Sequence, residues 1–310
     1  MTNTRSATRS THAVVVGVDG TAASVNAVRY ARGEAARCGV GVEIVHVVPT
    51  YIPMTPGYAL PPEDLMEAGR SVLRSVMDQL EPFDAVPVKA FVRKGGIVAT
   101  LTAQRHAQAV VVGSDRRSVV ARLLTGNVST LVAASAPVPT VSVPETWRPD
   151  EPKGVVLVGV KHRQQSDELL AEAFSVAHQR GSRLVVLHAW KMPAGYEDLI
   201  ANPRAYEDWD SRVGREIEEM LSAWRTQCPD VDVELRTAHD QPAHSLVEAS
   251  AEADEVVLVR RAHGAPPSVH LGATARSVLM HSHCPVRIVP PGHVRLTPDL
   301  TLEAAGTLLK

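Results

Sequence analysis

Three segments of the chain carry residues that could contribute to a ligand-binding site. They are Gly17-Val18-Asp19-Gly20, His46-Val47-Val48, and a longer stretch that runs from Val112-Gly113-Ser114-Asp115-Arg116-Arg117-Ser118-Val119 to Gly126-Asn127-Val128-Ser129. A glycine at the end of a strand lets backbone N–H groups approach an anion. A glycine just before a helix, with Asn and Ser at the helix start, leaves N–H groups and a hydroxyl for phosphate oxygens.

The elements around these segments must bring them together. In the N-terminal half, apolar runs predict strands, and amphipathic patterns between them predict helices. The expected strands cover residues 13–18, 42–48, 86–92, 109–112 and 140–143, and the later helices cover 63–80, 97–106 and 127–134. Strands that are apolar throughout need helices on both faces, which indicates a doubly wound parallel sheet. Ligands of such sheets bind beyond the carboxyl ends of the strands, where the strand order reverses.

The chain repeats this pattern. Val14-Val-Val-Gly-Val-Asp recurs as Val156-Leu-Val-Gly-Val-Lys, and Val110-Val111 recurs later as Val256-Val257. The second pair of segments is four residues further apart than the first pair, so the second half contains four additional residues. We place this insertion in the loop from Pro193 to Pro203. We therefore predict two tandem α/β domains, each with a five-stranded parallel sheet in the order 3-2-1-4-5 and helices on both faces. The expected boundaries are a tail (1–11), domain 1 (12–145), a linker (146–152), domain 2 (153–291) and a C-terminal tail (292–310).

Composition excludes several classes of protein. The 310 residues are 45% hydrophobic and 21% charged, which is typical of a packed protein and not of a disordered one. A net charge of −2 provides no general attraction to nucleic acid or to anionic lipid, and we expect neither as a partner. No apolar run reaches the length of a membrane span, and we expect no signal peptide. Three scattered cysteines without a CxxC pair favour a cytoplasmic protein.

Several other residue groups have a structural interpretation beside a chemical one. His46 and His188 occupy matching strand ends, which favours packing over catalysis, and Asp19 could be only a turn acceptor. His281-Ser282-His283-Cys284 has no evident fourth ligand, and we expect no metal there. The aromatic residues near the long helix of the second half indicate core or interface: Trp190, Tyr206, Trp209 and Trp224. No nucleophile elbow or P-loop occurs, so we expect no catalytic residues and at most slow nucleotide hydrolysis.

The glycine spacing resembles that of the universal stress protein family, in its tandem-domain form. The family motif is G-x2-G-x9-G-(S/T), and Gly113, Arg116, Gly126 and Asn127 stand at its four positions. The resemblance implies ATP as ligand, with Mg²⁺ present only if bound to the nucleotide. It implies adenine against Gly17, Asp19 and Val47, with the triphosphate over residues 113–119 and 126–129.

Two departures from the motif change this expectation. Arg116 replaces a glycine, so it either obstructs the phosphates or contacts them through its guanidinium. The second half keeps Gly272 but has Lys161, Val259 and Ala273 where the first half has Asp19, Gly113 and Asn127. We therefore expect the second half to be a structural partner with a vacant site.

The resemblance implies a cytoplasmic stress-response protein that binds ATP or a related adenine nucleotide in its N-terminal half and acts through protein partners. Two alternatives stay open: an interaction module that binds no nucleotide, and an adenine-nucleotide enzyme of the same fold group. We also expect the two halves to pair as an intramolecular pseudo-dimer through their fifth strands, because unpaired apolar edges invite another strand. A further homodimer is compatible with this arrangement.

Overall fold

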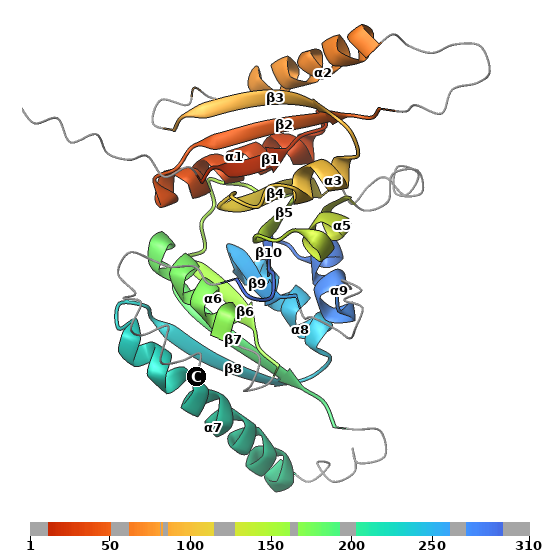
Figure 1. The fold of residues 1–310 in the computed structure, drawn as a ribbon. Helices are drawn as coiled ribbons and strands as arrows, with labels where there is room; N and C mark the ends of the chain where they lie inside the picture. Colours follow the sequence, from red (N-terminus) through yellow and green to blue (C-terminus); the bar gives the residue numbers. More distant parts are fainter. Residues whose placement is uncertain are drawn as a thin grey trace, which may run out of the picture.

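A single ten-stranded sheet runs through both halves of the protein (Figure 1). The computed structural model describes residues 12–50, 62–80, 82, 86–114, 128–161, 167–192, 203–260 and 271–293. The strand order is β3-β2-β1-β4-β5-β10-β9-β6-β7-β8. Each half therefore has the predicted order 3-2-1-4-5, and the doubly wound fold predicted from the repeat is confirmed.

The N-terminal half alternates strands and helices along the chain. Its strands are β1 (Val14–Gly17), β2 (Val42–Val48), β3 (Val88–Lys94), β4 (Ala109–Ser114) and β5 (Thr140–Pro144). Its helices are α1 (Ala22–Cys38), α2 (Pro62–Met77), α3 (Ile97–Thr102) and α5 (Val128–Ser135). Helix α3 ends earlier than expected, because the chain must turn before Gln108, whose backbone N–H donates to Ala13 O (2.9 Å).

The C-terminal half repeats this order. Its strands are β6 (Val155–Gly159), β7 (Arg183–Trp190), β8 (Val233–His239), β9 (Glu255–Val259) and β10 (Val286–Val289). Its helical segments are α6 (Asp167–Arg180), α7 (Pro203–Gln227), α8 (Pro242–Ala249), the short 3₁₀ turn η3 (Ser250–Glu252) and α9 (Ala273–His281).

The extra length of the second half lies in the helix and not in the loop before it. Helix α7 has 25 residues, whereas its counterpart α2 has 16. From the end of β7 at Trp190 to the start of α7 at Pro203, the chain is no longer than from Val48 to Pro62. The placement of the insertion at Pro193–Pro203 is therefore wrong. The buried apolar residues described in α7 are Ile217, Leu221 and Trp224, all in its C-terminal half, so the added turns extend the helix beyond this core. A repeat offset alone does not reveal this.

Both faces of the sheet are buried under helices. In β1, Val14 and Val16 pack toward α1 and α2, whereas Val15 packs toward α3 and α5. In the second half, α6 and α7 cover one face, and α8 and α9 cover the other. Trp190 and Trp224 are buried as expected, but Trp209 at 36% exposure is not part of the core. Because both faces of the sheet are buried, successive residues of each strand are apolar, and the strands are continuous apolar runs in the sequence.

The ends of helix α1 follow from its sequence. Thr21 is the N-cap, and its side chain accepts a hydrogen bond from Ser24 N (3.3 Å). Gly39 ends the helix in the left-handed conformation, at φ 65°. A side chain at that φ is strained, so glycine suits this C-cap. The cap places the N-terminus of α1 directly after β1, beside the first predicted ligand segment.

The two halves pair through their fifth strands. Strands β5 and β10 are antiparallel, and the paired residues are Ser142 with Val286, Val141 with Arg287 and Thr140 with Ile288. All other neighbouring strands are parallel. The pairing within one chain agrees with the predicted pseudo-dimer, and it covers the apolar edge that each half would otherwise leave open.

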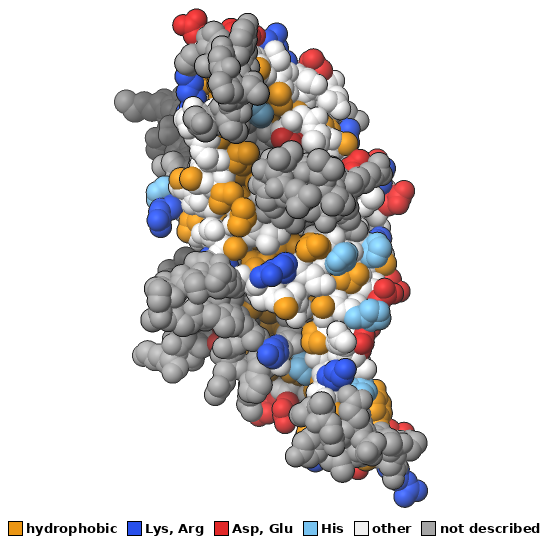
Figure 2. All heavy atoms as spheres, turned by 90° about the vertical axis from the view of Figure 1, so that its right-hand side faces the viewer, with side chains coloured by type: hydrophobic (Ala, Val, Ile, Leu, Met, Phe, Trp, Pro, Cys, Tyr) orange, Lys and Arg blue, Asp and Glu red, His pale blue; other side chains and the backbone are white. Residues whose placement is uncertain are grey.

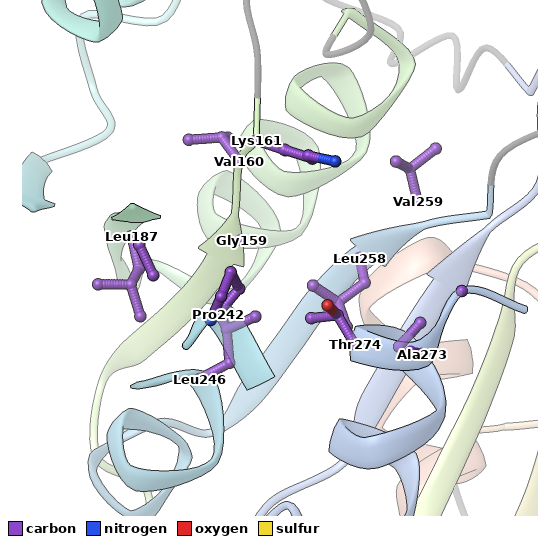
Figure 3. A pocket seen from close by; sticks show the side chains of 13 residues that line it. Gly159, Val160, Lys161, Leu187, Pro242, Leu246, Leu258, Val259, Ala273 and Thr274 are labelled. Carbon is purple, nitrogen blue, oxygen red and sulfur yellow. The ribbon is translucent and has the colours of Figure 1, made fainter. Parts of the chain in front are cut away.

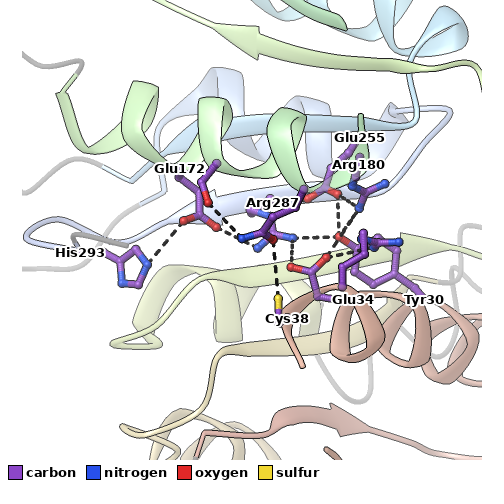
Figure 4. A network of polar contacts seen from close by, with 11 residues as sticks. Tyr30, Glu34, Cys38, Glu172, Arg180, Glu255, Arg287 and His293 are labelled. Atoms are coloured by element: carbon purple, nitrogen blue, oxygen red, sulfur yellow. Dashed lines mark hydrogen bonds and ion pairs between the residues drawn. The ribbon is translucent and has the colours of Figure 1, made fainter. Parts of the chain in front are cut away.

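A buried ionic network lies at this junction, between α1 and α6 (Figure 4). Arg287 of β10 is fully buried and donates to three carboxylates: Glu255 at 2.6 Å, Glu34 at 2.7 Å and Glu172 at 2.9 Å. Tyr30 of α1 donates its hydroxyl to Glu255 (2.6 Å) and accepts from Arg287 (3.0 Å). The first half supplies Tyr30 and Glu34, so the network connects the two domains.

The network holds its members in defined protonation states. Burial acts to lower the pKa of Arg287, but the Glu255 and Glu34 carboxylates outweigh it and raise that pKa well above its ordinary value. Burial also raises the pKa of the Tyr30 hydroxyl, which therefore stays protonated and can donate. Arg180 of α6 pairs with Glu255 as well. Removing one member would leave buried charge without its partner.

Candidate functional site

A cavity opens at the carboxyl ends of β1, β2 and β4, where the strand order reverses. Its volume is about 150 Å³. Five of the residues expected to bind a ligand line it: Gly17, Asp19, Val47, Gly113 and Val128. These residues come from four separate elements or the turns after them, so the fold does bring the predicted segments together at one edge of the sheet.

Asp19 is exposed and holds the turn that leads into α1. Its Oδ1 accepts from the backbone N–H of Thr21 (3.0 Å) and from the Thr21 hydroxyl (2.6 Å). The carboxylate therefore serves as a turn acceptor in this structure. It also lines the cavity, so the turn positions it at the cavity wall.

His46 binds the backbone in the same way as its counterpart in the second half. Its Nδ1 lies 2.8 Å from Val18 O, and His188 Nδ1 lies 3.0 Å from Val160 O. Both contacts fasten the end of the second strand to the end of the first. The structural interpretation of these two histidines agrees with this geometry.

Val47 of β2 lines the cavity. Val18 N donates to Val45 O on the side of β1, and Gly95 N donates to Val48 O on the side of β3. Backbone groups alternate sides along a strand, so the N–H and C=O of Val47 point to the β1 side. The last residue of β1 is Gly17, which pairs with Val45. Val47 therefore offers one donor and one acceptor beyond the end of β1.

Gly113 has a packing role that its place in the motif does not reveal. A Cβ at this position would lie 2.6 Å from the carbonyl carbon of Ala23 and 2.7 Å from Ser24 N. The backbone at the start of α1 thus packs directly on β4 at this glycine. The close approach stabilises the start of α1 over the cavity. In the second half Val259 stands at this position.

The remaining predicted site residues have other positions. Ser114 ends β4, and its carbonyl accepts from Glu145 N (3.2 Å). Ser129 lies in the first turn of α5 and is buried, and neither serine lines the cavity. The other predicted residues lie outside the described part of the chain: Asp115, Arg116, Arg117, Ser118, Val119, Gly126 and Asn127.

Four cavity residues escaped the sequence prediction: Ser24, Val45, Ile97 and Leu101. Ile97 and Leu101 of α3 form an apolar wall, and Ser24 of α1 lies opposite the end of β4. Ile97 is 38% exposed, which is high for a large hydrophobic side chain. The Gly95-Gly96 pair before α3 could have indicated that the start of this helix lies near the site, because the pair marks a turn at the carboxyl end of β3.

The C-terminal half contains a larger cavity at the corresponding place (Figure 3). Its volume is about 320 Å³, and it lies at the carboxyl ends of β6, β7 and β9, beside the start of α9. Lys161, Val259 and Ala273 line it. Two of these three residues, Lys161 and Val259, are bulkier than their counterparts in the first half. They line the cavity but do not fill it.

The His281-Ser282-His283-Cys284 segment is held by hydrogen bonds. Ser282 Oγ donates to Cys284 O (2.9 Å), and His283 N donates to Ser250 Oγ (2.9 Å). Burial raises the pKa of the Cys284 thiol to about 12, so the thiol stays protonated at neutral pH. Within the described ranges, no group of three or more His, Cys, Asp or Glu side chains could hold a metal ion.

The surface near α3, α5, α8 and α9 carries mixed charge (Figure 2). On that face, the described Lys and Arg side chains are interspersed with Asp and Glu, and hydrophobic side chains show between them. In the part of the chain that the structure describes, no helix has the length and apolar character needed to cross a bilayer.

These features define a tandem pair of doubly wound α/β domains with a cavity at each topological switch point. The family model for universal stress proteins matches residues 11–144 and 154–290. The chain belongs to the universal stress protein family.

Related proteins have the same tandem length. A universal stress protein of Mycobacterium tuberculosis (strain CDC 1551 / Oshkosh) is 31% identical over 303 residues, which cover 91% of this chain and 96% of that protein. One of Mycolicibacterium smegmatis is 31% identical over 290 residues, covering 90% and 97%. The crystal structure of a universal stress protein from Archaeoglobus fulgidus superposes with a TM-score of 0.66 at 19% identity, covering 91% and 97%.

Proposed function

We propose that this protein is a cytoplasmic stress-response regulator that binds ATP or a related adenine nucleotide in its N-terminal half. The observation that carries this proposal is the cavity at the switch point, where apolar walls meet one backbone donor and one backbone acceptor at Val47. The regulatory output would pass through protein partners and not through turnover. Three free cysteines support a reducing compartment.

The cavity suits an adenine ring in two respects. Ile97, Leu101 and Val47 supply aliphatic surface for the faces of a flat base. The N–H and C=O of Val47 match the acceptor and donor on the Watson–Crick edge of adenine. Guanine presents the opposite order on that edge, so it would leave polar groups unpaired. We therefore propose adenine over guanine.

One observation favours the alternative, an interaction module that binds no nucleotide. Among the described residues, the Asp19 carboxylate accepts from the backbone N–H and the hydroxyl of Thr21, so it already has a structural use. Gly113 likewise serves the packing of α1. A module of this kind would keep the fold and both residues without any ligand.

A thermal-shift experiment on the full chain tests the proposal. A ligand that binds only the folded state stabilises it by about 2.7 kcal/mol at a hundredfold excess over Kd. ATP should raise the melting temperature, and GTP should raise it much less. Ile97→Trp should fill the rim of the cavity and abolish the ATP effect. Leu131→Trp is the matched control, because Leu131 is also exposed, at 46%, but does not line the cavity.

Two outcomes would decide between the alternatives. If millimolar ATP leaves the melting temperature unchanged, the protein is the nucleotide-independent module. If ATP binds and phosphate or pyrophosphate is released at a steady rate, the enzymatic alternative gains the support that the sequence does not provide.

A further inference from the structure

The cavity of the C-terminal half has the size of a small-molecule site. Ligand pockets usually begin near 300 Å³, and this one measures about 320 Å³, roughly twice the cavity of the N-terminal half. In liquid water this volume would hold on the order of ten molecules, which corresponds to a ligand of about ten non-hydrogen atoms. The cavity is therefore large enough for a small organic molecule.

Its walls are mostly hydrocarbon. Leu187 of β7, Leu246 of α8 and Leu258 of β9 point into it from three sides, with Pro242 beside Leu246 (Figure 3). Binding of an apolar group to such a surface is favourable, by about 25 cal/mol for each Å² of apolar surface removed from water. The part of the ligand that enters the cavity should therefore be apolar.

Lys161 is the one cation among the described residues that line the cavity. Lys161 follows β6, and its side chain extends from the strand end toward Val259 of β9 (Figure 3). Within the described part of the chain, Lys161 forms no ion pair, so its charge is available to a ligand. The N-terminal half has Asp19 at this position, so the sign of the charge is reversed between the two cavities.

The start of α9 lies across the cavity from the β6 end and adds to this positive character. Ala273, Thr274 and Ala275 line the cavity in the first turn of that helix. The N-cap is Gly272, which has no side chain to accept from the first N–H groups. An anionic group between Lys161 and this turn would receive both a charge and hydrogen-bond donors.

We propose that the C-terminal half binds a compact apolar molecule with one negative charge, a small carboxylic acid, whose carboxylate lies at Lys161 and whose hydrocarbon part fills the cavity. Val259 replaces the glycine of the phosphate motif, and the acidic residue of the N-terminal half is a lysine here. The site is therefore built for a different ligand from the adenine nucleotide proposed for the other half, and it does not depend on that proposal.

Calorimetric titration of the full chain with octanoate, which has ten non-hydrogen atoms, tests the proposal. We expect binding at one molecule per chain. Lys161→Gln should weaken it roughly tenfold or more, since a hydrogen bond to a charged group is worth about 1.5–3 kcal/mol. Lys89→Gln, at an exposed position of β3, is the matched control and should leave the affinity unchanged. Octanamide has the same chain without the charge and should bind as weakly as octanoate binds to Lys161→Gln.

A second variant tests the place of the ligand. Ala273 is exposed at the cavity mouth, so Ala273→Phe should block entry without disturbing the core. Ala68→Phe, on an exposed position of α2, is its control. The proposal is wrong if octanoate does not bind at millimolar concentration, if Lys161→Gln and Lys89→Gln bind equally, or if Ala273→Phe binds normally. It is also wrong if ATP displaces octanoate, because the cavity would then be a nucleotide site. Ile97→Trp should not affect octanoate, which separates this result from the N-terminal site.

Discussion

Arg287 of β10 donates from Nη2 to Oε1 of Glu34 in α1 at a distance of 2.7 Å, across the junction between the two halves. Both side chains are at most 1% exposed. The two residues lie in different domains, so neither domain alone can supply both charges. The pair ties the antiparallel β5–β10 contact to the packing of α1 against α6. The junction is therefore a specific interface and more than a pairing of two strand edges.

Replacing Arg287 should destabilise the protein strongly. Arg287→Met keeps much of the aliphatic length but leaves Glu34, Glu172 and Glu255 buried without their shared cation. We expect a loss of about 3–5 kcal/mol in the free energy of unfolding, measured by urea denaturation. Arg74→Met removes an exposed pair with Glu67 and should cost less than about 1 kcal/mol. Equal stability of the two variants would contradict a structural role for the network.

Adding one methyl group at Gly113 should disturb the start of α1. Gly113→Ala places a Cβ 2.6 Å from the Ala23 backbone, which the helix can relieve only by moving. We expect a destabilisation of about 1–3 kcal/mol by chemical denaturation, together with weaker ATP binding. In contrast, Gly214→Ala has open space within α7 and should stabilise by up to about 1 kcal/mol. If Gly113→Ala is neutral, the close contact is not required.

Cys284 should be unreactive in the folded protein. Its thiol is 1% exposed, and burial raises its pKa to about 12, so almost no thiolate exists at pH 8. Brief treatment with iodoacetamide, followed by mass spectrometry, should leave Cys284 unmodified until urea is added. The half-buried Cys38 serves as the internal reference in the same sample. Modification of Cys284 before unfolding would show that this segment opens in the native state.

The exposed pair of His244 and Asp240 should titrate as a unit. His244 Nδ1 donates a hydrogen bond to Asp240 Oδ2 at 2.6 Å, and this contact raises the pKa of the imidazole above its ordinary value of 6.5. The contribution of this pair to the stability of the folded protein is therefore fully present below about pH 6.5. It is lost as the pH rises through the raised pKa of His244 in the folded state. An NMR titration should show this raised pKa, and Asp240→Asn should return it toward 6.5. A pKa unchanged by Asp240→Asn would exclude the carboxylate as the cause.

The sequence by itself determined the repeat, the doubly wound class, the strand order and the edge of the sheet where the site lies. These features follow from local patterns, because the period of apolar residues and the glycines at strand ends report how a segment packs. It also placed Gly17, Asp19, Val47, Gly113 and Val128 at one cavity. Carboxyl ends of parallel strands must meet at the same edge, so no long-range contact was needed for that prediction.

Only the tertiary structure decided how the buried charges pair and which cavities stay open. Glu34 and Glu172 are polar residues on helix faces, and nothing near them in the sequence indicates that Arg287 neutralises both. The openness of the C-terminal cavity depends on how Leu187, Leu246 and Leu258 are spaced by three separate elements. The role of Gly113 likewise depends on the path of α1 above it. Such contacts join residues far apart in the chain, and their distances are set by packing, which local pattern does not encode.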